Sequence, residues 1–234
     1  MGDTLYIVMP AYNEGENIEE TVKNWYPVLA LGSEDSRLVI ADSGSSDNTH
    51  EVLENLQKEY DKLVILSDTG KQHGPKVIAL YKYASERADY VFQTDSDGQT
   101  DPAEFKAFWD LRGSYDAVIG NRVVRGDGKS RKMVENTVCL LLRIIFGVKV
   151  EDANAPFRLI RCSMLSKYLD RFDPDYNLPN IMLVVFFSHY KEKITFREIS
   201  FKARQKGTNS IDIKKIVKIG IKAVGDFRRF KKTL

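Results

Sequence analysis

Long hydrophobic runs are absent from the sequence. The apolar stretches Val138 to Phe146 and Leu183 to Phe187 are much shorter than the about 20 residues that a membrane-spanning helix needs, and Arg143 interrupts the first. The amino terminus also lacks the basic segment followed by an apolar one that marks a secretory signal. We therefore expect neither stretch to cross a membrane and the protein to stay in the cytoplasm.

Cysteine is scarce, and linker-like segments are missing. Cys139 and Cys162 show no metal-ligand spacing, so we expect two buried apolar thiols in a reducing compartment. No Pro/Gly/Ser-rich stretch or internal repeat divides the 234 residues, of which 43% are hydrophobic and 29% charged. This composition is that of an ordinary globular protein and predicts one domain.

Two nucleotide-binding motifs are also missing. No G-x-G-x-x-G follows the first predicted strand, and no Walker loop occurs, which disfavours a dinucleotide-dependent dehydrogenase or a P-loop enzyme. Short apolar runs nevertheless alternate with segments of helical periodicity. Strands are predicted at Leu5–Met9, Leu38–Ala41, Leu63–Leu66 and Tyr90–Phe92, with helices around Ile18–Trp25, Val52–Leu56 and Val77–Ala84. This alternation predicts an α/β fold with a mostly parallel central sheet and helices on both faces.

Carboxylates follow three of the predicted strands. Glu14, Asp42 and the pair Asp95/Asp97 each come after a strand, so they should gather along one rim of the sheet, where open α/β sheets bind ligands. Two aspartates one residue apart suit a hard divalent cation that also contacts substrate phosphates. For Glu14 or Asp42 alone, a helix cap is the favoured interpretation.

Five short motifs in this order resemble family 2 glycosyltransferases, which have the GT-A fold and use nucleotide-activated sugars. They are Pro10-Ala11-Tyr12-Asn13-Glu14, Asp42-Ser43-Gly44-Ser45-Ser46-Asp47, Asp95-Ser96-Asp97-Gly98-Gln99, Gly120-Asn121-Arg122 and Asp152 to Leu159. The branch that the sequence resembles most contains the dolichyl- and polyprenyl-phosphate sugar transferases. The resemblance implies a GT-A domain at 1–210, with a nucleotide-sugar half at about 1–120 and an acceptor half at about 121–210.

The resemblance also implies roles for individual residues. A nucleotide would be held by Pro10, Ala11, Tyr12, Glu14, Asp42, Ser43 and Asp95. Apart from the resemblance, Lys76 is expected in a loop after the third predicted strand, from which it would approach the nucleotide. A divalent metal, Mg²⁺ or Mn²⁺, would be held by Asp95, Asp97 and Gln99. The family often has a second acidic residue where Ser43 stands, so we expect a modified nucleotide pocket.

Basic residues dominate the second half of the chain. Arg122, Arg125, Lys129, Arg131 and Lys132 are predicted to lie in a mobile loop, either solvated or gripping phosphate. The family resemblance favours phosphate binding by Arg122, Arg131 and Arg204, the last from an Arg204-to-Ser210 loop. Asp152 and Arg158 match the family's Asp…Phe-Arg motif, and with Asp97 they form the predicted catalytic set. Asp152 would be the base for an acceptor hydroxyl, would orient an acceptor phosphate, or would form a buried structural pair with Arg158.

The carboxyl-terminal region is strongly basic although the whole chain has a formal net charge of only +2. Residues 211–234 are predicted to form an amphipathic helix with basic residues opposite its apolar face. This helix either is an ordinary solvated one or lies on an anionic membrane through Lys214, Lys215, Lys218, Lys222, Arg228 and Arg229. The second possibility would place the protein peripherally on the inner face of the cell membrane, where a separate membrane-protein partner could also hold it.

The sequence as a whole predicts a metal-dependent, inverting glycosyltransferase. Its donor would be a UDP- or GDP-linked sugar and its acceptor a polyprenyl phosphate. One alternative is transfer to a saccharide hydroxyl in cell-surface polysaccharide synthesis, and another is an inactive scaffold that binds sugar nucleotides. We expect no nucleic-acid partner.

Overall fold

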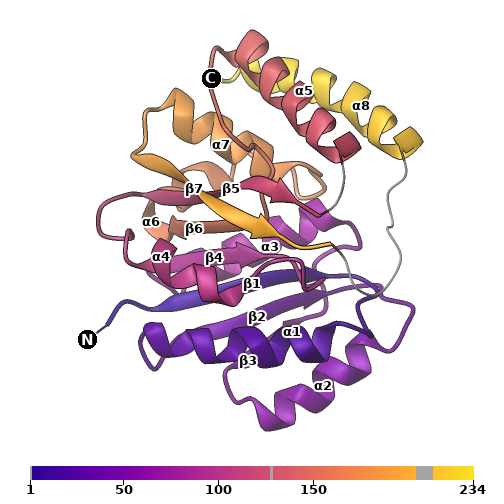
Figure 1. The fold of residues 1–234 in the computed structure, drawn as a ribbon, viewed down its shortest axis with the longest axis vertical. Coiled ribbons are helices and arrows are strands. Elements are labelled where there is room, and N and C mark those ends of the chain that lie inside the picture. Colours follow the sequence, from indigo (N-terminus) through magenta and orange to yellow (C-terminus); the bar gives the residue numbers. More distant parts are fainter. Residues whose placement is uncertain (1, 127–128, 204–212) are drawn as a thin grey trace.

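The computed structural model describes residues 2–126, 129–203 and 213–234. Its centre is a seven-stranded sheet in the order β3-β2-β1-β4-β6-β5-β7 (Figure 1). The strands are β1 (Leu5–Ala11), β2 (Arg37–Asp42), β3 (Leu63–Leu66), β4 (Tyr90–Thr94), β5 (Ala117–Arg125), β6 (Phe157–Arg161) and β7 (Ile194–Phe201). The four strands predicted from the sequence are all present.

One strand of the sheet runs against the others. β1 pairs in parallel with β2 and β4, β2 with β3, and β5 with β7, whereas β6 is antiparallel to both β4 and β5. Six strands therefore end at the same edge of the sheet, and β6 begins there. The prediction of a mostly parallel sheet is confirmed, and the segment before β6, which carries Asp152, reaches the edge at which the other strands end.

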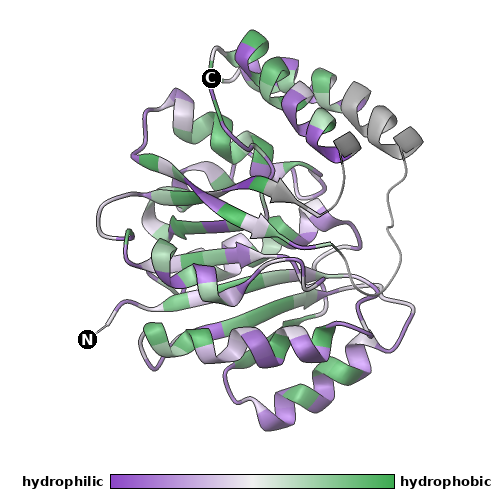
Figure 2. Cartoon of the chain, viewed as in Figure 1, coloured by the Kyte–Doolittle hydropathy of each residue, from purple (hydrophilic) through white to green (hydrophobic). Residues whose placement is uncertain are grey.

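Helices cover both faces of the sheet, as predicted. One face is covered by α1 (Ile18–Trp25), α2 (Thr49–Glu59) and α4 (Phe105–Trp109), and the other by α3 (His73–Ser85), α6 (Cys162–Leu169) and α7 (Pro179–His189). Two short 3-10 helices, η1 (Tyr26–Leu31) and η2 (Pro102–Glu104), join the elements. Apolar residues concentrate on the strands and on α7 (Figure 2), whose run Leu183–Phe187 is entirely buried.

The prediction that the basic residues between Arg122 and Lys132 lie in a mobile loop is wrong. Arg122 and Arg125 belong to β5, and Lys129, Arg131 and Lys132 begin the long helix α5 (Lys129–Phe146). The strand forms because β5 pairs along its length with β7, more than seventy residues later in the chain. The last strand, β7, extends over Ile194–Phe201 and has β5 as its partner. The expected boundary between the two halves, near residue 120, falls inside β5.

Helices α5 and α8 (Ile213–Lys231) lie side by side at one end of the molecule (Figure 1). The Phe146 and Phe227 rings meet at a centroid distance of 5.9 Å. Of the stretch Val138–Phe146, only Leu142 is fully buried, while Leu140 and Ile144 are exposed. Cys162 is buried and Cys139 is partly buried. In the described parts of the chain, no helix combines the length and the apolarity needed to cross a membrane.

Candidate active site

The turn after β1 is held by the polar turn after β2. Ala11 and Asp42, the last residues of these strands, face each other in the sheet. The backbone N–H of Asn13, which has a φ of 55°, donates to Ser45 Oγ at 3.0 Å, and that of Glu14 donates to Thr49 Oγ1 at 2.8 Å. Two segments that lie 32 to 35 residues apart in the sequence thus form one edge, and the predicted gathering of Glu14 and Asp42 is confirmed.

Each polar residue on this edge is held in place by neighbours. Glu14 is buried and accepts a hydrogen bond from Asn17 Nδ2 at 2.9 Å. Asp42 accepts from Ser45 Oγ at 2.5 Å and lies 3.2 Å from His50 Nδ1, a contact that no sequence motif indicated. Ser43 Oγ donates to the Ser67 carbonyl at 2.7 Å and so joins the loops after β2 and β3. Ser43 therefore has a structural role in this edge as well as its predicted place in the nucleotide pocket.

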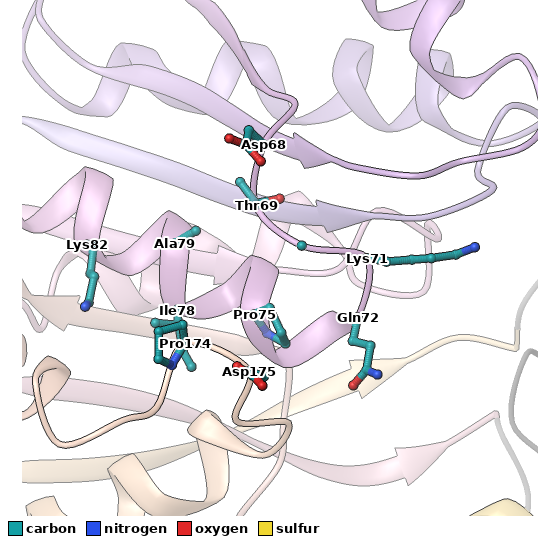
Figure 3. Close-up of a pocket in the computed structure, with 11 residues that line it drawn as sticks. Asp68, Thr69, Lys71, Gln72, Pro75, Ile78, Ala79, Lys82, Pro174 and Asp175 are labelled. Atoms are coloured by element: carbon teal, nitrogen blue, oxygen red, sulfur yellow. The ribbon is translucent and has the colours of Figure 1, made fainter.

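Lys76 is a buried cation beside the predicted nucleotide pocket. It lies in the first turns of α3, so the expected loop position is wrong. Its Nζ donates to the Ala11 carbonyl and is 5.2 Å from the centre of the Tyr12 ring. Burial lowers the pKa of Lys76 to about 8, with the nearby Asp42 charge opposing the shift. An open pocket of about 520 Å³ lies next to this region, between α3 and residues 174–175 (Figure 3). None of the described site residues predicted from the sequence lines that pocket, so it lies beside the site.

Asp95, Asp97 and Gln99 follow β4 on the same edge. Gly98, with a φ of 73°, makes the turn between them, and the backbone N–H of Gln99 donates to Asp97 Oδ1 at 3.1 Å. Gln99 Nε2 donates to the Lys202 carbonyl at 2.7 Å, which fixes the amide against the end of β7. Burial and the neighbouring Asp97 raise the pKa of Asp95 well above its usual range, with Glu14 adding to the effect and Arg122 opposing it. Three carboxyl groups, those of Glu14, Asp95 and Asp97, therefore lie near one another at this edge.

These three residues fit a hard divalent cation by their chemistry. Asp95 and Asp97 offer carboxylate oxygens, and Gln99 offers its amide Oε1 because Nε2 is already used as a donor. Among the described residues, no group of three or more His, Cys, Asp or Glu side chains is arranged to hold a metal. A cation at this edge would therefore need oxygen atoms from a bound diphosphate in addition to these three residues.

Asp152 pairs with Arg122 and not with Arg158. Arg122 Nε lies 2.7 Å from Asp152 Oδ2 and Arg122 Nη2 lies 2.8 Å from Oδ1, which is a bidentate pair of buried groups. Burial opposes ionisation of Asp152, but the hydrogen bonds and charge of Arg122 outweigh it and hold the pKa of Asp152 below its usual range. Asp152 is consequently a carboxylate with both oxygens occupied. The proposed pair with Arg158 is wrong because β5, on the far side of β6, brings Arg122 to the same place.

Arg158 holds the segment that carries Asp152. It is fully buried at the start of β6, and its guanidinium donates to the carbonyls of Ala155 at 2.8 Å, Asn180 at 3.0 Å and Ala153 at 3.4 Å. In this structure the guanidinium N–H groups of Arg158 thus donate to backbone carbonyl oxygens. Of the two other predicted phosphate-binding residues, Arg131 lies partly exposed in the first turns of α5, and Arg204 lies outside the described residues.

The chain is similar to known proteins over most of its length. The model of the family described as "Glycosyl transferase family 2" matches residues 6–172. An undecaprenyl-phosphate 4-deoxy-4-formamido-L-arabinose transferase from Pectobacterium carotovorum subsp. carotovorum is 21% identical over 91% of this chain and 64% of its own length. An undecaprenyl-phosphate mannosyltransferase from Micrococcus luteus is 29% identical over 68% of this chain and 66% of its own length. The aligned part of the chain corresponds to about half to two thirds of the length of the curated relatives that it matches.

Solved structures share the fold. Glucosyl-3-phosphoglycerate synthase from Mycobacterium tuberculosis, in complex with Mn²⁺, UDP-glucose and phosphoglyceric acid, superposes with a TM-score of 0.70 at 18% identity. That alignment covers 98% of this chain and 80% of the other chain. The fold is thus the GT-A type expected from the sequence. Because the family model also covers well over half of the residues, the chain belongs to glycosyl transferase family 2.

Proposed function

We propose that this chain is a metal-dependent, inverting glycosyltransferase that moves a sugar from a nucleoside-diphosphate sugar to a polyprenyl phosphate. The observation that carries the acceptor assignment is the bidentate Asp152–Arg122 pair. A carboxylate with both oxygens bound to a guanidinium, and with a lowered pKa, is a poor base for a hydroxyl group. A phosphate acceptor is already ionised and needs no such base.

The donor would bind along the edge formed by the ends of β1, β2 and β4. Pro10, Ala11, Tyr12, Glu14, Asp42 and Ser43 would hold the base and ribose. Asp95, Asp97 and Gln99 would hold Mg²⁺ or Mn²⁺, which would neutralise charge on the departing diphosphate. Lys76, buried beneath Tyr12, would add positive charge on the nucleotide side. The two relatives described above are named for transfer to undecaprenyl phosphate, and the solved neighbour binds Mn²⁺ and UDP-glucose, which supports these assignments.

Transfer to purified undecaprenyl phosphate in detergent micelles tests the proposal directly. A panel of UDP- and GDP-sugars would be offered with Mn²⁺, with Mg²⁺ and with a chelator. We expect one donor to be turned over only with a metal, and its product to be a lipid-linked sugar of inverted anomeric configuration. Transfer only to saccharides would favour the hydroxyl-acceptor alternative. Binding of a sugar nucleotide without any transfer would favour the inactive scaffold.

The substitution Asp152→Asn separates the two acceptor classes. Removing a general base typically costs two to four orders of magnitude in turnover. If the acceptor is a phosphate, Asp152 only orients Arg122 and the acceptor, and we expect a loss of about 10- to 100-fold. Turnover and donor affinity would be measured together with the melting temperature. A larger loss of turnover at unchanged donor affinity would show that Asp152 acts as a base.

Helix α5 offers a surface for the lipid. Met133, Leu140 and Ile144 are 68%, 56% and 69% exposed, and their spacing of seven and four residues places them on one face of the helix. The basic residues Lys132 and Arg143 are exposed as well, and the helix contains a single acidic residue, Glu135, which is turned inward. An apolar face flanked by cations is complementary to an anionic bilayer surface. We therefore assign peripheral membrane binding to α5 together with the basic helix α8.

Replacing Met133, Leu140 and Ile144 by Ser should abolish most binding to anionic vesicles. Each apolar side chain contributes roughly 1 kcal/mol when its exposed half enters the interface, so the triple variant should bind about 100-fold more weakly. Co-sedimentation with vesicles of phosphatidylglycerol and phosphatidylcholine, across a salt series, measures this. Leu31→Ser is the matched control, since Leu31 is also an exposed leucine but lies on η1. Equal sedimentation of wild type and triple variant would contradict the assignment.

A further inference from the structure

The single acidic side chain of α5 is turned toward Asp152. Glu135 Oε1 accepts the backbone N–H of Ala153 at 2.8 Å, and Glu135 Oε2 lies 3.1 Å from Arg122 Nη2. The Glu135 side chain is only 12% exposed. One guanidinium from β5 is therefore held by two carboxylates, one from α5 and one from the segment before β6. No motif in the sequence pointed to Glu135, because its partners lie 13 and 18 residues away in the chain.

Glu135 and the exposed apolar residues occupy opposite faces of α5. At about 100° per residue, position 135 lies roughly 200° around the helix from position 133, whereas positions 140 and 144 lie within about 20° of it. Leu142 and Cys139, which share the inner face with Glu135, are buried and partly buried. Any displacement of α5 at a lipid surface must therefore move Glu135, and with it a hydrogen bond to the segment 152–155.

We propose that Glu135 is a positioning residue that couples α5 to the Asp152–Arg122 pair. The proposal rests on the lipid-phosphate acceptor proposed above. A planar guanidinium bonded on two sides by carboxylates has a fixed orientation. The N–H of Ala153, held by the same carboxylate, fixes the residue next to Asp152. Binding of α5 to the bilayer thereby fixes the positions of Arg122 and Asp152, the groups that would contact the acceptor phosphate.

The test compares Glu135→Ala, Glu135→Gln and the control Asn136→Ala, an exposed neighbour on the same helix. Hydrogen exchange reports on the Ala153 amide, UDP binding with Mn²⁺ reports on the donor site, and transfer to undecaprenyl phosphate reports on turnover. In Glu135→Ala we expect exchange at Ala153 to rise at least about 10-fold, turnover to fall about 10-fold, and UDP affinity to stay unchanged. Glutamine keeps an acceptor for the Ala153 N–H, so Glu135→Gln should restore slow exchange and part of the turnover.

A double variant distinguishes coupling from general damage. If Glu135 acts through Asp152, adding Glu135→Ala to Asp152→Asn should cost little more than Asp152→Asn alone. The proposal would be overturned if the turnover loss of the double variant equalled the product of the two single losses. It would also be overturned if Glu135→Ala showed normal exchange and turnover. A proportionate loss of UDP-binding sites, which indicates unfolding alone, would overturn it as well. If wild type transfers only to a saccharide, the proposed acceptor is wrong, and the same comparison with that saccharide still decides the role of Glu135.

Discussion

The substitution Asp97→Ala should abolish sugar transfer and metal-dependent nucleotide binding without unfolding the protein. Asp97 is partly exposed just after the carboxyl end of β4, and it accepts a local hydrogen bond from the backbone N–H of Gln99. A bound divalent cation stabilises developing charge by several kcal/mol, so its loss should reduce turnover by at least about 1000-fold. The free energy of unfolding should change by no more than about 1 kcal/mol, as is usual for surface positions.

Asp101→Asn is the matched control for Asp97→Ala. Asp101 lies on the same loop, where it caps η2 through the Ala103 N–H and pairs with Lys202. Asparagine preserves the cap, so metal-dependent UDP binding, measured by calorimetry with Mn²⁺, should match wild type. If Asp97→Ala retains metal-dependent transfer at an unchanged melting temperature, the metal assignment to this edge is wrong.

Arg158→Met should destabilise the fold by at least about 3 kcal/mol. The change leaves three buried carbonyl groups, of Ala153, Ala155 and Asn180, without their donor, and each such loss costs about 1–3 kcal/mol. Urea unfolding should show a lower midpoint at an unchanged slope, and the melting temperature should fall by roughly 10 °C.

Arg161→Met gives the comparison for Arg158→Met within the same strand. Arg161 is partly exposed and bonds the Arg112 carbonyl at 3.0 Å, with Asp116 at 3.5 Å, so its loss should cost about 1 kcal/mol or less. Equal stability of the two variants would show that Arg158 does not hold the segment 153–155. Retained stability of Arg158→Met with a selective loss of transfer would instead favour the catalytic role that the sequence motif suggested.

Local sequence patterns predicted the first half of the fold well. Strand β3 begins and ends at the predicted residues, Leu63 and Leu66, and helix α1 begins and ends at Ile18 and Trp25, as predicted. Both predictions succeed because polar turn residues bound each segment. The rim of Glu14, Asp42, Asp95 and Asp97 followed from one geometric rule, that parallel strands end at the same edge. These predictions required no knowledge of contacts between distant segments.

The second half depends on pairings that no local pattern reveals. Arg122 sits in a stretch rich in basic residues and glycine, which suggested a loop, yet β7 supplies its strand partner and Asp152 its ion pair. The order β4-β6-β5 decides which arginine meets Asp152, whereas the sequence motif offered Arg158 as its possible partner. The sequence analysis missed Glu135 and His50 for the same reason, since a sequence does not show which carboxylate or imidazole contacts another side chain.

The reversed strand β6 also determines how the protein can be divided. It lies between β4 and β5 and supplies both of them with backbone partners. A fragment ending before β5 would therefore carry β4, which contains the buried residues Val91 and Phe92, as a bare edge. Such an unprotected edge recruits further chains and leads to self-association. Cutting the chain into separately expressed halves should therefore yield insoluble material.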